Sequence, residues 1–133
     1  MKQPVLLCYN LSGERARGVR MAAMRLKVRV REVRKDEYAL PVGSLCGLEK
    51  PRQMPEAAGD FSDEMLVMAF FPAGMMNLFL QTMRRTGVGH IALKAVLTET
   101  NARWDSLRLH EELAREREAL TAGEAAAHGK AQE

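Results

Sequence analysis

The sequence predicts an α/β domain with a four-stranded sheet built from two β-α-β units and helices on both faces. The order apolar run, turn, amphipathic helix and strand occurs twice, in residues 4–33 and 64–97. The chain has 133 residues, of which 47% are hydrophobic and 28% charged, and this suits a single domain with its own core. Cys8 and Cys46 stand outside any CxxC or Cys/His spacing, so we expect buried, reduced thiols.

The first unit begins with a continuous apolar run at residues 4–9 (PVLLCY), which predicts a strand. Turn residues follow, with Ser12 as a candidate N-cap for a helix over residues 14–27. Residues 28–33 (VRVREV) then alternate apolar and charged side chains, a pattern that predicts a strand at the border of the sheet.

The second unit repeats this order in residues 64–97. An apolar strand is expected at 64–71, a helix at 73–86 with its stop at 87–89, and another strand at 91–97. The residue identities of the two units differ, so we expect a repeat of architecture and not of sequence.

Between and after the units lie three further segments. Residues 40–47 predict a short helix with Pro41 at its first position, and residues 50–63 predict a flexible loop. Asp105 and Ser106 are alternative N-caps of a last helix that ends near Leu120. The prediction is therefore one domain over 1–120 and a disordered tail over 121–133.

The two fully apolar strands, 4–9 and 64–71, need cover on both faces, which places them in the sheet centre and favours the order 2-1-3-4. We expect a parallel sheet whose right-handed crossovers put the first and last helices on one face and the other two on the opposite face. A ferredoxin-like α+β sandwich, with the order 4-1-3-2, is the alternative.

The helix at 73–86 has more apolar surface than one sheet face can cover. Either the last helix or the 50–63 loop packs on it, or it forms a homodimer interface, since flexible Met side chains suit such a surface. The candidate interface residues are Met75, Met76, Phe79, Leu80 and Met83.

Residues 93–104 read LKAVLTETNARW, an apolar strand with one lysine, a polar turn and the single tryptophan. This stretch resembles the hallmark of the bacterial family called domain of unknown function 3783, and the resemblance covers residues 64–118 best. Glu99 stands where the family motif has proline, which loosens the turn. The resemblance implies small cytoplasmic proteins without an established activity, so it assigns no catalytic residue.

Lys94 lies on an apolar strand, so its ammonium group needs an acceptor or an exit to solvent. One alternative is that it extends from an edge strand to solvent or pairs with a carboxylate such as Asp60 or Asp63. The other is a small-anion site at the strand's carboxyl end, formed by Lys94, Thr98, Thr100, Asn101 and Trp104. Thr98, Thr100 and Asn101 also suit a purely local turn, and Trp104 suits an anchor for the last helix.

Other chemistry has no signature here. His90, His110 and His128 lack metal-ligand spacing, and Ser44 is outside a nucleophile elbow, so we expect neither a metal nor a cofactor. The basic residues of the first unit lack interleaved aromatics, which argues against nucleic acid. Apolar runs are too short for a membrane helix, and we expect no export, because the first residues lack the pattern of a secretory signal.

Charge is uneven along the chain. Residues 1–40 hold ten Lys and Arg against four Asp and Glu, whereas residues 99–133 hold five against eight. This asymmetry favours either head-to-tail contact between molecules or simply two solvated surfaces, and the second interpretation is the better supported. From the apolar surplus of the 73–86 helix and the absence of catalytic motifs, we expect a cytoplasmic, non-catalytic protein-interaction module that self-associates, with the small-anion or enzymatic site as the alternative.

Overall fold

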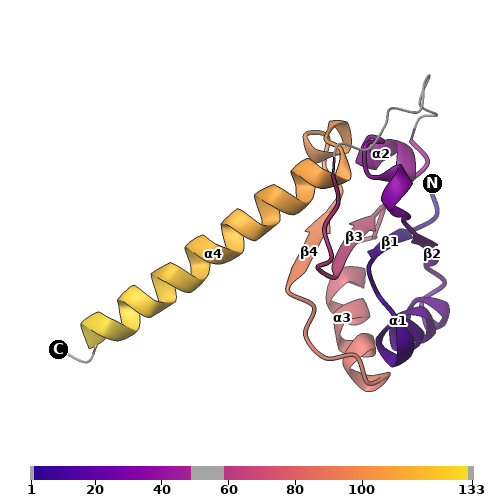
Figure 1. The fold of residues 1–133 in the computed structure, drawn as a ribbon. Coiled ribbons are helices and arrows are strands. Elements are labelled where there is room, and N and C mark those ends of the chain that lie inside the picture. Colours follow the sequence, from indigo (N-terminus) through magenta and orange to yellow (C-terminus); the bar gives the residue numbers. More distant parts are fainter. Residues whose placement is uncertain (1, 49–58, 132–133) are drawn as a thin grey trace.

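The computed structural model describes residues 2–48 and 59–131, with side chains as far as Thr121. Its core is a four-stranded sheet in the order β2-β1-β3-β4, the order that the sequence predicts (Figure 1). The strands are β1 (Val5–Tyr9), β2 (Arg29–Glu32), β3 (Met65–Ala69) and β4 (Leu93–Val96). Every residue of β1 and β3 is buried, because both faces of these central strands are covered.

The helices connect and cover these strands. They are α1 (Gly13–Arg25), α2 (Val42–Leu45), α3 (Met75–Arg85) and α4 (Ser106–Ala131), with short 3-10 turns η1 (Lys35–Glu37) and η2 (Asn101–Arg103). The predicted loop at 50–63 falls mostly outside the described residues, and its described part, 59–63, has neither helix nor strand. No helix of the described chain combines the length and apolarity needed to cross a membrane.

The sheet is mixed, so the expected all-parallel arrangement is wrong. β1 pairs with β2 in parallel and β3 with β4 in parallel, but β1 and β3 are antiparallel, with Leu7 opposite Val67 at the centre. The two β-α-β units are therefore related by an approximate two-fold axis through the middle of the sheet. The ferredoxin-like order is also absent from this sheet.

The antiparallel contact also overturns the predicted distribution of helices. Two right-handed units related by a two-fold axis perpendicular to the sheet put their helices on the same face. One core cluster accordingly joins Leu6 and Leu66 to α1 and α3, and the other joins Leu7 and Val67 to α2 and the start of α4. The last helix thus lies opposite α1, not beside it.

The repeat is visible in the backbone turns, at a constant offset of 60 positions. Asn10 and Phe70 follow the first strands of their units with φ of 60° and 62°, and Lys27 and Gly87 end the helices with φ of 57° and 85°. The architectural repeat is therefore present although the residue types differ.

Helix α4 is longer than expected. The sequence placed its end near Leu120, followed by a disordered tail, but in the structure it continues to Ala131. Alanine-rich sequence favours helix, and each isolated glycine costs only about 1 kcal/mol. The second half of α4 leaves the body of the molecule beyond β4 (Figure 1).

Candidate functional site

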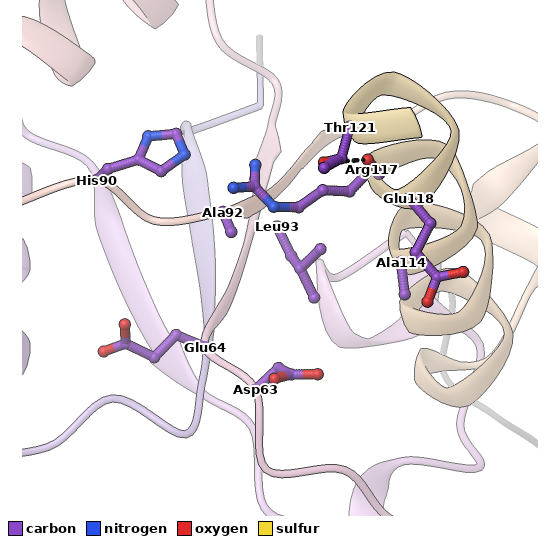
Figure 2. Close-up of a pocket in the computed structure, with 9 residues that line it drawn as sticks. All are labelled: Asp63, Glu64, His90, Ala92, Leu93, Ala114, Arg117, Glu118 and Thr121. Atoms are coloured by element: carbon purple, nitrogen blue, oxygen red, sulfur yellow. Dashed lines mark hydrogen bonds between the residues drawn. The ribbon is translucent and has the colours of Figure 1, made fainter. Parts of the chain in front are cut away.

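A concave surface lies between the edge strand β4 and helix α4. A cavity of about 710 Å³ opens between the amino end of β4 and the middle of α4, and a second of about 270 Å³ lies toward the carboxyl end of β4. Ala114, Arg117, Glu118 and Thr121 form the helix wall of the larger cavity, at spacings of three and four residues that place them on one face (Figure 2). We call these two cavities together the β4–α4 groove.

Arg15 organises the floor of the larger cavity from α1. Its Nε lies 3.0 and 2.8 Å from the two carboxylate oxygens of Glu64, and its Nη2 donates to the His90 carbonyl at 3.1 Å. A bidentate arginine–carboxylate pair has a defined geometry. Arg15 therefore ties the entrance of β3 to the loop that leads into β4.

Asp63, at the other side of the cavity, lies 2.8 Å from Nε2 of His110 through its Oδ2. The His110 ring stacks on Phe61 with ring centroids 4.0 Å apart. Asn10, in its left-handed conformation, donates through Nδ2 to the carbonyls of Phe61 and Asp63. These contacts hold the approach to β3 against α4.

All five predicted ligand residues line the smaller cavity, but the polar groups of two of them, Thr98 and Asn101, serve the turn. Asn101 is buried, its Oδ1 accepts from the Thr98 N–H at 2.8 Å, and its Nδ2 donates to the Val96 carbonyl at 3.0 Å. Thr98 in return accepts the Asn101 N–H at 3.1 Å. Thr100 is exposed. The local turn accounts for Thr98 and Asn101, and ligand binding by the five residues stays a prediction.

Trp104 is half-buried against the core cluster below the sheet, and the Arg108 guanidinium lies 4.6 Å from its ring centroid. Its backbone carbonyl accepts the Val42 N–H at 2.8 Å. These contacts join the start of α4 to α2, which is the anchoring role that the sequence suggested as one alternative.

Among the described side chains Lys94 pairs with no carboxylate, so the expected pairing with Asp60 or Asp63 is wrong. Its Nζ donates to the Ile91 carbonyl, while Asp60 lies near Lys35 and Asp63 near His110. Lys94 pairs in register with Leu66, whose side chain belongs to the core cluster on the α3 face. The ammonium group thus lies toward the amino end of β4, away from the turn at Thr98.

The cationic neighbours of Lys94 come from elements that the sequence does not bring together. Burial lowers the pKa of Lys94, and the charges of Arg117 and Arg84 lower it further. The charge of Lys94 is the largest cause of the lowered pKa of His90, followed by burial, Arg117 and Arg84. No motif indicates this group, because its members lie on α3, a loop, β4 and α4.

The predicted interface residues of α3 divide between core and surface. Phe79 and Met83 are buried, and Met75 and Leu80 pack partly against the same cluster, where α1 and not α4 lies beside them. Met76 is 39% exposed and Leu78 48% exposed. A partner could therefore contact only the outer part of the proposed set without rearranging the core.

Both cysteines are buried and free, in agreement with the expected thiols. Burial raises the pKa of Cys8 to about 12 and that of Cys46 to about 11, so neither is a reactive thiolate at neutral pH. Within the described residues, no three His, Cys, Asp or Glu side chains converge as metal ligands would.

Fold and groove together define a small α/β protein with a mixed, open-edged sheet and a projecting C-terminal helix. The family model described as Domain of unknown function (DUF3783) matches residues 64–120, which confirms the resemblance expected from the LKAVLTETNARW stretch. The match covers β3, α3, β4 and the first part of α4. No curated protein and no solved structure matches the chain.

Proposed function

We propose that the chain is a non-catalytic protein-interaction module that forms a homodimer. In this dimer β4 of one copy pairs with β4 of the other, and the two α4 helices lie along the same face of the joined sheets. The observation that carries this proposal is that the body-facing stripe of α4 continues past the open edge of β4. The groove, the edge and the helix each contribute to the argument.

The open edge of β4 supports strand addition. The Leu97 N–H donates to the Met68 carbonyl at 2.9 Å, so alternate peptide groups face β3 and those of Lys94 and Val96 face outward. The Val96 carbonyl already accepts a hydrogen bond from the Asn101 side-chain amide. Among the described residues, the Lys94 peptide groups and the Val96 N–H therefore remain available to an added strand.

The leucines along one face of α4 support a partner that packs against this helix. Leu109, Leu113 and Leu120 are spaced by four and seven residues and share one helix face. Leu109 is 2% exposed and packs below the sheet, whereas Leu120 is 68% exposed. Since α4 leaves the body past β4, a strand added to β4 would lie beside the projecting part of α4 (Figure 1).

The charge pattern of α4 favours a second copy as the occupant. Residues 111–118 read EELARERE, and Arg115 already pairs with Glu111 and Glu112 within its own helix. Between two antiparallel copies, the two arginines of this stretch in one helix can each meet one of the four glutamates of the other. A two-fold β4–β4 contact is also closed, so assembly stops at two chains.

Sedimentation velocity at micromolar concentration tests the dimer, which we expect for the full chain. Leu120→Glu removes the apolar overhang and Val96→Pro removes the outward N–H, and each should raise the dimer dissociation constant by about tenfold or more. Met76→Glu, at an exposed α3 position, is the matched control and should leave the dimer unchanged.

Two results would contradict this arrangement. A chain that stays monomeric at all concentrations excludes self-association. Dissociation by Met76→Glu but not by Leu120→Glu would place the interface on α3, as the sequence first suggested. Growth into long polymers would instead indicate head-to-tail contact, since such contacts do not close.

A further inference from the structure

Three cationic side chains and one histidine surround the loop between α3 and β4. Arg84 lies in the last turn of α3, His90 in the loop, Lys94 on β4 and Arg117 on α4. A cavity of about 430 Å³ on the α3 side is lined by Arg84, His90 and Lys94, and the larger cavity of the groove is lined by His90 and Arg117. His90 is thus the point at which the two cavities meet, and Arg117 extends toward it from α4 (Figure 2).

The acids around this cation cluster do not neutralise it. Glu64 is held by Arg15 and Asp63 by His110, which leaves Glu118, on the same helix wall as Arg117, as the remaining acid of the larger cavity. Among the described side chains, none of the four in this cluster forms a salt bridge. The cluster therefore carries an excess of positive charge.

The cations also act on one another. Lys94 and both arginines lower the pKa of His90, and both arginines add to the effect of burial on Lys94. His90 and Lys94 are therefore less stable in their charged forms than each would be alone. A bound anion would reverse this effect.

The cavity on the α3 side has an apolar floor, and the loop that borders it is held by hydrogen bonds. Leu80, Met83, Val88 and Ile91 form its floor. The loop is held by the bonds from Arg15 to the His90 carbonyl and from Lys94 to the Ile91 carbonyl. An apolar floor with converging charged groups at its rim is the common form of a small-molecule site.

We propose that the cation cluster of Arg84, His90, Lys94 and Arg117 binds the phosphate group of a small phosphomonoester whose apolar part rests on the floor of the α3-side cavity. Arginine and lysine donors from separate elements suit a dianion with three acceptor oxygens. The site lies at the amino end of β4, and it does not depend on the proposed dimer.

The test is a titration of the full chain with inorganic phosphate and with phenyl phosphate, followed through the His90 imidazole signals by NMR at constant ionic strength. Both ligands should shift these signals saturably and raise the pKa of His90, because a bound dianion favours the charged imidazole. Phenyl phosphate should bind more tightly, since its ring can cover the apolar floor.

Variants identify the residues that bind. Arg117→Gln, on the exposed part of α4, should weaken phosphate binding by about tenfold while leaving the fold intact, as expected when a charge-assisted hydrogen bond is lost. Lys94→Met should weaken it similarly. Arg103→Gln lies outside both cavities and is the control, and Leu120→Glu should retain binding even if the dimer is lost.

The proposal is overturned if chloride or acetate at the same ionic strength shifts the His90 signals as phosphate does. It is equally overturned if Arg117→Gln binds phosphate as tightly as the unchanged chain does. Should Lys94→Met fail to fold, the comparison of Arg117→Gln with Arg103→Gln still decides.

Discussion

Tyr9 and Ser106 form a polar contact inside the core, at the join between the sheet and α4. The Tyr9 hydroxyl lies 2.7 Å from the Ser106 Oγ, and neither residue is exposed to solvent. Burial is the largest cause of the raised pKa of Tyr9, so its hydroxyl stays protonated and can donate. The pair satisfies both hydroxyl groups in a region that water does not reach.

We expect Ser106→Ala to lower the free energy of unfolding by about 1–3 kcal/mol, because it leaves the buried Tyr9 hydroxyl without a partner. Urea denaturation measures this change. Tyr9→Phe should also destabilise the chain, but the double variant should lose less than the two single losses added together, since neither group is then left unpaired. Additive losses would show that the hydrogen bond contributes nothing.

This contact also decides which of two candidate residues caps the last helix. Either Asp105 or Ser106 could cap the last helix, since both side chains suit an N-cap. In the structure the Asp105 carboxylate accepts the Arg108 N–H at 2.8 Å, while Ser106 turns into the core. The choice depends on the partner that β1 supplies, and no local pattern contains it.

At the scale of elements, α1 and α3 approach each other closely because a glycine stands at their contact. A Cβ atom on Gly18 would lie 2.5 Å from the Val88 Cγ2 and 2.8 Å from the Thr86 carbonyl oxygen. The Thr86 hydroxyl also donates to the Gly18 carbonyl at 2.7 Å. The two helices therefore pack backbone to backbone at this point.

Gly18→Ala should lower the midpoint of chemical unfolding, with a loss of about 1–3 kcal/mol from overpacking. The sign of this change in the free energy of unfolding is informative, because replacing a glycine by alanine in a helix interior would otherwise stabilise the chain by up to about 1 kcal/mol. Gly59→Ala, where a Cβ meets nothing within 4 Å, is the control and should change little. A Gly18→Ala chain as stable as the original would mean that the helices separate at little cost.

The extent of most elements was predictable, because each depends on a short pattern of side chains. The apolar runs of β1 and β3, the alternation of β2 and the helical spacing in α1 all lie within a few residues of sequence. The end of α4 was not predictable in this way. Sequence reasoning expected a tail after Leu120 because large apolar residues are missing, whereas helix propensity alone extends the helix.

At the scale of the whole molecule, the two-fold relation between the units suggests a test at their helix ends. Val28 donates to the Ala23 carbonyl and Val88 to the Met83 carbonyl, at 2.8 and 2.9 Å, so the two ends have the same geometry. The left-handed position before these residues is Lys27 in the first unit and Gly87 in the second. Glycine takes this conformation without steric cost.

Lys27→Gly should therefore stabilise the chain by about 0.5–1 kcal/mol, since it removes the strain of a side chain at positive φ. The reciprocal change, Gly87→Lys, should destabilise it by a similar amount. Thermal unfolding monitored by circular dichroism measures both. Equal and opposite shifts would support the equivalence of the two helix ends, and a loss of stability in Lys27→Gly would contradict it.

The sequence by itself determined which segments form strands and helices, which two strands occupy the sheet centre and which strand lies at its border. These properties follow from how much apolar surface each short segment must bury. Only the tertiary structure decided that β1 and β3 run antiparallel, because a strand that is apolar at every position satisfies both faces in either direction. The same antiparallel contact places α1 beside α3 on one face of the sheet and α4 on the other face, near the β4 edge. It also brings Arg84, His90, Lys94 and Arg117 together from separate elements. Their proximity results from how the units pack, which spacing along the chain does not encode.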